Sequence, residues 1–232
     1  MTGAADATVR GVLVDLDDTL YPQAAFLDVA WHAVADCGAR RGLDRDALLA
    51  ALHAEAAAGS ARGGIIDRAL ARSGGRAELV PELLAAFRST NPDRLEPYPR
   101  VREALAALRG RVPVALVSDG EVTGQQRKVA ALGLAGMFAA VVFSDTWGRE
   151  RRKPHPQPFE EALRRIGAEP REAVMIGDRP DKDIAGASRA GVRAIRVSTG
   201  EYADRPDHRG TWMRVSGFAA AVERLLPHLP VR

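Results

Sequence analysis

The sequence predicts an α/β protein whose core is a Rossmann-like, mainly parallel sheet between two layers of helices, with an all-helical domain inserted into it. Two observations carry this prediction. From residue 97 onward, apolar runs of strand length alternate with stretches of helix length, which is typical of a parallel sheet with right-handed helical crossovers. Before that point, about seventy residues after the first apolar run are rich in helix formers, which indicates an all-helical insert.

The first strand is the apolar run at residues 12–14, which leads directly into Asp15, Asp17 and Asp18. A single aspartate after a strand is often a turn or helix-cap residue. Three carboxylates so close together repel one another, and a cation or a shared proton would relieve that repulsion. The carboxyl edge of an open α/β sheet is also where such folds place their binding and active sites.

The insert follows this strand, and four stretches in it carry apolar residues at helical spacing. Glycines and an Asn-Pro pair separate them, and Asp44 is a predicted N-cap. We place the insert at residues 22–96 and the core at residues 1–21 and 97–232. Because the insert leaves and rejoins the core around the first strand, we expect it to cover the carboxyl edge of the sheet. The predicted helices are 23–39, 44–58, 62–72 and 77–89.

The remainder of the core alternates regularly between the two kinds of element. A Gly-, Asp- and Pro-rich connection separates the last long strand from the closing helix. The predicted strands are 112–117, 139–143, 173–176 and 194–197, with a short edge strand at 212–215, and the predicted helices are 99–108, 121–132, 157–166, 181–190 and 218–226.

Composition narrows the class of protein. Lys and Arg total 33 against 30 for Asp and Glu, so the net charge of +3 provides no surface that would grip nucleic acid. Cys37 is the only cysteine, which excludes an intrachain disulfide and indicates a reducing compartment. No apolar run approaches the roughly 18 residues of a membrane span, and the first ten residues hold no apolar signal segment. We expect a cytoplasmic monomer or homodimer without nucleic-acid or membrane partners.

Lysine is rare in this chain, with Lys128, Lys153 and Lys182 as its three examples among 33 basic residues. Where arginine occupies almost every basic position, a lysine is a candidate for a role that needs a compact ammonium group. Chance explains any single lysine equally well.

Polar residues follow four of the predicted strands. Each alone is better explained as a turn residue, a solvated charge or a first-turn helix acid. A parallel sheet, however, brings all four strand ends to one edge, so together they predict a site. These residues are Asp15 and Asp17 after the first strand, Ser118, Asp119 and Gly120 after the second, Lys153 after the third, and Asp178 and Asp183 after the fourth.

The same stretches resemble the four ordered motifs of the haloacid dehalogenase superfamily of hydrolases. They are DLDDT at residues 15–19, an apolar strand ending in Ser118, Lys153 followed by Pro154, and GDRPDKD at residues 177–183. The resemblance covers the core, and the insert is similar to the helical type-one cap of that family. Two features depart from the family pattern: the loop before Lys153 is about two residues longer than common, and Asp119 puts an acid beside the expected phosphate site.

The resemblance implies a magnesium-dependent phosphomonoester hydrolase that acts on a small phosphorylated metabolite through an aspartyl-phosphate. Phosphate oxygens repel an attacking anion, so such a site must first neutralise charge. The implied roles are Asp15 as nucleophile, Asp17 as general acid and base, Lys153 as catalytic and phosphate-binding cation, Ser118, Asp119 and Gly120 as phosphate-binding residues, and Asp15, Asp178, Asp183 and the Asp17 carbonyl as residues that hold or support Mg²⁺.

Further expectations concern the residues around the nucleophile. Asp15 and Asp17 are two apart on an extended chain and should face the same way. Asp17 needs a pKa above about 3.9 to act as an acid, and neighbouring anions push it in that direction. We expect Thr19 to steady the turn and Asp18 to be a turn or surface acid.

Several alternatives share parts of this pattern. A 2-haloacid dehalogenase needs the nucleophile but neither magnesium nor a leaving-group acid, and members with that activity typically lack an acid at the position of Asp17. A phosphomutase would use the same core with a second hydroxyl in place of water.

Outside enzymes, two alternatives remain. A receiver-type signalling domain is typically shorter and lacks the insert. A non-catalytic phosphate-ligand binding protein would keep the site without turnover. Substrate choice should lie in the insert.

Overall fold

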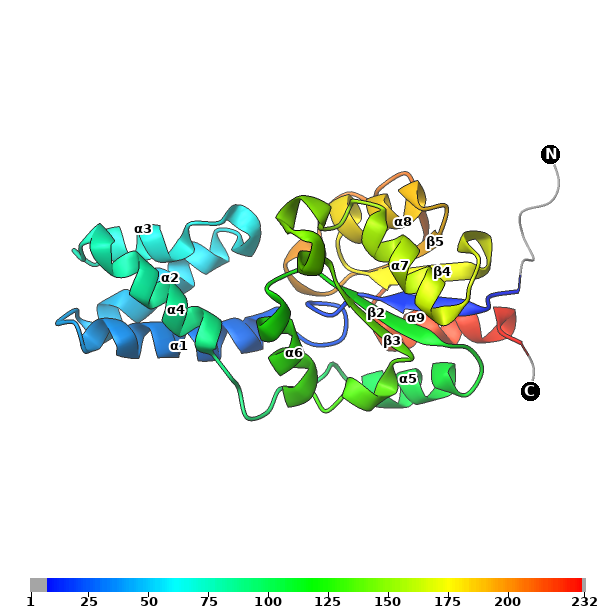
Figure 1. Ribbon diagram of the computed structural model, residues 1–232, viewed down its shortest axis with the longest axis horizontal. Helices are drawn as coiled ribbons and strands as arrows, with labels where there is room; N and C mark the ends of the chain where they lie inside the picture. The colour runs from blue at the N-terminus through cyan, green and yellow to red at the C-terminus, as the bar shows by residue number, and fades with distance from the viewer. Residues whose placement is uncertain (1–7, 231–232) are drawn as a thin grey trace. The chain divides into compact units, whose positions relative to one another are not determined.

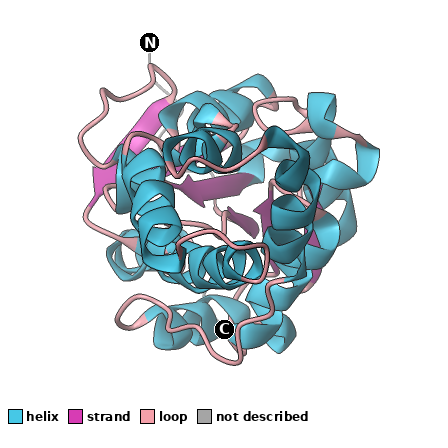
Figure 2. Cartoon of the chain, turned by 90° about the vertical axis from the view of Figure 1, so that its left-hand side faces the viewer, coloured by secondary structure: helices cyan, strands magenta, loops and turns pink. Residues whose placement is uncertain are grey.

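The computed structural model describes residues 8–230, so most of the N-terminal segment considered above lies outside the described residues. The chain divides into two compact units, one formed by Met1–Gln23 with Arg94–Arg232 and the other by Ala24–Asp93. The strands belong to the first unit, and the second is helical (Figure 2). Among the described residues, none of the helices combines the length and the apolar character needed to cross a bilayer.

The first unit contains a parallel sheet that has six strands within residues 8–230. Its order is β3-β2-β1-β4-β5-β6, so the first strand pairs with β2 on one side and β4 on the other. The strands β1, β2 and β4 are buried throughout, which explains why they read as continuous apolar runs. The bounds are β1 Gly11–Val14, β2 Val114–Ser118, β3 Ala140–Phe143, β4 Ala173–Gly177, β5 Arg193–Val197 and β6 Thr211–Val215.

Helices cover both faces of this sheet (Figure 1). On one face, Phe159 and Leu163 of α7 pack with Leu13 of β1 and Met175 of β4 in a buried apolar cluster. On the other face, α9 packs against β5, β6 and α5. Successive strand residues point to opposite faces, so each strand supplies both apolar layers. The bounds are α5 Val101–Arg109, α6 Val122–Ala131, α7 Gln157–Ile166, α8 Ala185–Arg189 and α9 Phe218–Leu225.

The second unit has its own apolar core. Trp31 is buried there and stacks on Phe87 with ring centroids 5.0 Å apart. Asp44 caps its helix as predicted, accepting hydrogen bonds from the amides of residues 46 and 47 at 3.0 Å each. The predicted helix at 62–72 begins only at Ile65, because Gly63 and Gly64 have positive φ angles of 66° and 59°. The bounds are α1 Gln23–Ala39, α2 Arg45–Ala57, α3 Ile65–Arg72 and α4 Val80–Ser89.

Candidate active site

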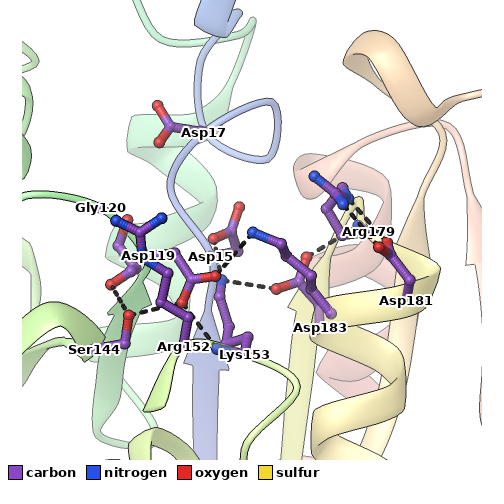
Figure 3. A network of polar contacts seen from close by, with 12 residues as sticks. Asp15, Asp17, Asp119, Gly120, Ser144, Arg152, Lys153, Arg179, Asp181 and Asp183 are labelled. Atoms are coloured by element: carbon purple, nitrogen blue, oxygen red, sulfur yellow. Dashed lines mark hydrogen bonds and ion pairs between the residues drawn. The ribbon is translucent and has the colours of Figure 1, made fainter. Parts of the chain in front are cut away.

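The carboxyl ends of the central strands meet at one edge of the sheet. Val14, the last residue of β1, is in register with Leu116 of β2 and Ile176 of β4. The polar residues that follow these strands therefore leave the sheet side by side. Figure 3 shows Asp15, Lys153 and Asp183 meeting in one group, although they are far apart in the sequence.

Asp15 is held through both carboxylate oxygens. Oδ1 accepts a hydrogen bond from Lys153 Nζ, and Oδ2 accepts one from Thr19 Oγ1 at 3.2 Å. The Lys153 ammonium also donates to the Val117 carbonyl at 3.1 Å and lies 2.7 Å from Asp183 Oδ1. The longer loop therefore does not keep Lys153 from Asp15. Thr19 does more than steady the turn, because it contacts the carboxylate directly.

Asp15, Asp178 and Asp183 each present a carboxylate oxygen within 4.8 Å of the others, and all three residues are buried. Within residues 8–230, Lys153 is the cation that makes ion pairs with this group, through Asp15 and Asp183. Oδ1 of Asp178 is buried without a hydrogen-bond partner in the described part of the chain. Three buried carboxylates with one ammonium leave uncompensated negative charge. An oxygen-only donor set of this kind fits a hard divalent cation such as Mg²⁺.

The pKa values of Asp15 and Asp178 report the same imbalance. Burial raises the pKa of Asp15 to about 7 against the opposing effect of Lys153, and Asp183 adds to the rise. Burial, followed by the charges of Asp183 and Asp15, raises the pKa of Asp178 well above its ordinary value. A bound cation would favour the ionised forms and reverse these shifts.

The glycine of GDRPDKD is required by the packing of the last acid. A Cβ on Gly177 would lie 2.4 Å from Asp183 Oδ2, too close for any larger residue. That oxygen also accepts a hydrogen bond from the backbone amide of Arg179 at 3.0 Å. The motif thus pairs a residue without a side chain with the carboxylate that occupies the space.

These shifts predict how stability depends on pH. A raised pKa means that the folded protein without metal binds more protons than the unfolded chain between about pH 4 and about pH 7. The free energy of unfolding should therefore fall as pH rises through this window. Because Asp15 and Asp178 titrate as a coupled group, the loss belongs to the pair, and it should be on the order of a few kcal/mol. The lowered pKa values of other aspartates act below about pH 4 and leave this window unaffected.

Urea unfolding at about pH 5 and about pH 7.5, in EDTA and in magnesium, checks this prediction. Magnesium should remove most of the loss, because it binds the ionised carboxylates. Asp15→Asn should also flatten the pH dependence in EDTA. A metal-free stability that rises between the two pH values would contradict the prediction.

Asp17 lies in a separate set of contacts. Its Oδ1 accepts hydrogen bonds from Lys128 Nζ at 2.8 Å and from Tyr21 Oη at 2.5 Å, and its Oδ2 accepts one from Gln125 Nε2 at 3.0 Å. Figure 3 shows its carboxylate pointing away from the group formed by Asp15, Lys153 and Asp183.

Two expectations for Asp17 are therefore wrong in this structure. Strand β1 ends at Val14, so Asp15 and Asp17 are not on a regular strand, and the rule that residues two apart share a face does not hold. Burial favours a higher pKa for Asp17, but the Lys128 charge and the hydrogen bonds from Lys128, Tyr21 and Gln125 outweigh it, and the pKa is lowered.

The residues after β2 are also brought to this edge. Ser118 Oγ is buried and accepts a hydrogen bond from Gln125 Nε2 at 2.5 Å. The amide of Gly120 donates to Asp145 Oδ1 at 3.3 Å, so in this structure it is engaged by the protein.

Asp119 does not leave a free charge beside the expected phosphate site. Its Oδ1 accepts hydrogen bonds from Ser144 Oγ at 2.8 Å and from the Lys153 amide at 3.0 Å, and its Oδ2 lies 3.1 Å from Lys182 Nζ. Burial alone would raise its pKa, but Lys153 and Lys182 lower it. Asp119 thus anchors the Lys153 loop to the end of β2.

Asp18 is a turn residue, but it is not on the surface. Its side chain is buried, and it accepts hydrogen bonds from the amides of Gln23 at 2.9 Å and Glu201 at 3.3 Å. Thr199 Oγ1 donates to its carbonyl. A Cβ on Gly200 would lie 2.1 Å from Asp18 Cγ, so a glycine is needed where the two loops meet.

Sequence reasoning did not assign Gln125 and Lys128 to the site. Both lie on α6 and are buried, so their helical spacing alone resembles that of core residues. The scarcity of lysine was the available signal. Each of the three lysines contacts an aspartate at this edge: Lys128 contacts Asp17, Lys153 contacts Asp15 and Asp183, and Lys182 contacts Asp119.

The fold and the residues at the carboxyl edge of its sheet define a class of hydrolase. The model of the haloacid dehalogenase-like hydrolase family matches residues 9–191, and the chain belongs to that family. A glyceraldehyde 3-phosphate phosphatase of Methanopyrus kandleri is 37% identical over 204 residues, which are 84% of this chain and 87% of that protein. A phosphoserine phosphatase of Thermus thermophilus is 39% identical over 151 residues, which are 65% of this chain and 59% of that protein.

Solved structures agree on the fold. A 2-haloacid dehalogenase from Pseudomonas syringae pv. Tomato DC3000 is 26% identical, with a TM-score of 0.64 and coverage of 94% of this chain and 98% of that one. A haloacid dehalogenase-type phosphatase from Thermococcus onnurineus has a TM-score of 0.66 at 22% identity, with the same coverage. The predicted family, α/β fold and phosphatase class of enzyme are confirmed.

Proposed function

We propose that this protein is a magnesium-dependent phosphomonoester hydrolase that acts on a small phosphorylated metabolite through an aspartyl-phosphate on Asp15. The observation that carries the proposal is the environment of Asp15. Lys153 and Thr19 hold its two oxygens, and Asp178 and Asp183 lie beside it in an acidic group that fits a divalent cation. The phosphatase names of its relatives support the same reaction.

Magnesium would be held by Asp15, Asp178 and the Asp17 carbonyl, with support from Asp183, and would supply positive charge that offsets the repulsion between phosphate and carboxylate. Lys153 contributes a fixed charge at the attacking carboxylate. Ser118 retains a hydroxyl hydrogen that can be donated to a phosphate oxygen, because its oxygen is the acceptor in the bond from Gln125. We assign the remaining phosphate contacts to the loop of Asp119 and Gly120.

In the first step, a carboxylate oxygen of Asp15 attacks phosphorus, and the bond between phosphorus and the ester oxygen breaks. The departing alkoxide takes a proton from Asp17, which must be protonated and turned toward it. In the second step, water attacks phosphorus and gives a proton to Asp17, and the bond to Asp15 breaks to release phosphate. The ionised Asp17 of this structure is the form required by the second step.

The similarity to a 2-haloacid dehalogenase makes halide displacement the second candidate. That reaction needs no magnesium and no leaving-group acid. The buried acidic group and the acid at Asp17 therefore favour phosphate esters. A phosphomutase would use the same core with a sugar hydroxyl as acceptor.

Hydrolysis of p-nitrophenyl phosphate with magnesium, and its loss in EDTA, is the expected result that tests the proposal. Glyceraldehyde 3-phosphate and phosphoserine are the first natural esters to compare, because relatives are named for them. Release of halide from a 2-haloacid, without phosphate release, would replace the proposal with the dehalogenase. Binding of phosphate without turnover of any ester would favour a non-catalytic binder.

We further propose that residues 22–96 act as a cap that selects the leaving group, while the core residues 1–21 and 97–232 recognise the phosphoryl group. The core can bind only what all phosphate esters share. The cytoplasm suits a protein whose one cysteine, Cys37, is a buried thiol.

A further inference from the structure

Two side chains of α6, Gln125 and Lys128, form with Tyr21 a set of donors around Asp17, which we call the Asp17 cradle. The two lie one helical turn apart and are 3% and 6% exposed. Lys128 Nζ lies 2.8 Å from one carboxylate oxygen of Asp17 and 3.0 Å from the other. The carboxylate is thus held at both oxygens by groups from one helix and by Tyr21.

Gln125 connects the cradle to the phosphate-binding hydroxyl. Its Nε2 is 3.0 Å from Asp17 Oδ2 and 2.5 Å from Ser118 Oγ. A side-chain amide has two hydrogens to donate, so both are used here. The position of the Ser118 hydroxyl and that of the Asp17 carboxylate are therefore set by one rigid amide group.

Stability alone is a poor reason for this arrangement. A buried lysine and carboxylate lose their favourable hydration energy, and their mutual attraction barely offsets that loss. Such pairs therefore add little net stability. The carboxylate of Asp17 also remains one-fifth exposed, whereas the Lys128 side chain is 7% exposed. The Lys128 ammonium is desolvated and contacts a carboxylate that stays partly exposed to solvent. This arrangement is better explained by a role in orienting Asp17 than by packing of an apolar core.

We propose that Gln125 and Lys128 are positioning residues that act through Asp17 and Ser118. They fix the ionised Asp17 relative to the hydroxyl that binds the phosphoryl group, so that the attacking water of the second step meets Asp17 at the correct place. This inference rests on the proposed function. It assigns to neither residue a contact with the reacting atoms.

The test is a double-mutant cycle between Lys128→Met and Asp17→Asn, measured with p-nitrophenyl phosphate and magnesium. Lys128→Met should lower kcat at least about tenfold while kcat/KM changes less than about threefold, because phosphate binding and the first step are kept and the slow water step lowers KM together with kcat. The double variant should be no slower than Asp17→Asn within about twofold, because the lysine has no other route to the reaction. Circular dichroism and thermal unfolding check that the single and double variants are folded.

Rapid mixing gives a second readout. Nitrophenolate leaves without a proton, so a misplaced Asp17 should slow the water step more than the first step. Lys128→Met and Gln125→Met should show a burst of about one nitrophenolate per enzyme before a slow steady state. Gln126→Met, the exposed neighbour of Gln125, is the matched control and should behave as the native protein.

Independent, multiplying losses in the double variant would overturn the inference, and so would a loss in Gln126→Met equal to that in Gln125→Met. Either result leaves the proposed function standing if the native protein hydrolyses the ester. Absence of hydrolysis by the native protein would instead overturn the proposed function, and this inference with it.

Discussion

Asp15→Asn is expected to lower kcat for phosphate-ester hydrolysis by a factor of about 10⁴ or more, as the loss of a nucleophile does in other enzymes. The amide oxygen cannot attack phosphorus as an anion, and the amide has only one acceptor oxygen for the two donors, Lys153 and Thr19, that hold Asp15. Thr19 would also lose a charged acceptor for its hydroxyl. Because Asp15 belongs to the acidic group, the variant should bind magnesium more weakly as well.

Steady-state rates and trapping of the phosphorylated protein together check this prediction. The native protein, stopped with acid during turnover of labelled substrate, should carry label that hydroxylamine releases, and Asp15→Asn should carry none. Asp181→Asn is the matched control, since this aspartate lies in the segment after β4 that also holds Asp178 and Asp183, but it pairs with Arg179 and is 61% exposed. Retained turnover in Asp15→Asn would contradict an attack by this residue.

Lys153→Met is expected to produce the second large effect, a loss of about 3–5 kcal/mol in the free energy of unfolding near neutral pH together with loss of turnover. The Lys153 side chain is 3% exposed, and its removal leaves the buried carboxylates of Asp15 and Asp183 without their ammonium. The loss should be smaller at lower pH, because Asp15, whose pKa is raised, binds a proton and becomes neutral.

Urea unfolding in EDTA and in magnesium, at two pH values, measures this loss. Magnesium should restore part of the stability of Lys153→Met, because it replaces the missing positive charge, but should not restore turnover. Lys182→Met is the control: its partner is also an aspartate of this edge, but Lys182 is 28% exposed, so the cost should stay below about 1 kcal/mol. Equal losses in the two variants would show that Lys153 has no special place in the acidic group.

Most of the fold could be predicted because it depends on local patterns. The apolar runs of β1, β2 and β4 are buried on both faces and have no alternating polar residues to confuse them with surface strands. The N-cap at Asp44 was recognisable because capping involves groups only a few residues apart. The start of α3 was placed wrongly, since the positive φ angles of Gly63 and Gly64 are not visible in a pattern of apolar spacing.

That these polar residues gather at one edge of the sheet could be predicted for a similar reason. In a parallel sheet, residues that follow the strands reach the same edge, so Asp15, Ser118, Lys153 and Asp178 could be grouped before their distances were known. The contacts of the individual side chains could not be predicted in this way. Asp18 is buried because a distant loop at Thr199 and Gly200 closes over it, and nothing near Asp18 in the sequence indicates that loop.

By itself, the sequence determined the class of this protein: the order of its strands and helices, the helical insert, and the acids and lysine that gather at one edge. Only the tertiary structure decided which way each carboxylate points and which cation it meets. Asp17 shows why. Its direction and its lowered pKa come from Gln125 and Lys128, more than a hundred residues away. Such charge pairing acts across a few ångströms of space, which local spacing along a chain does not encode.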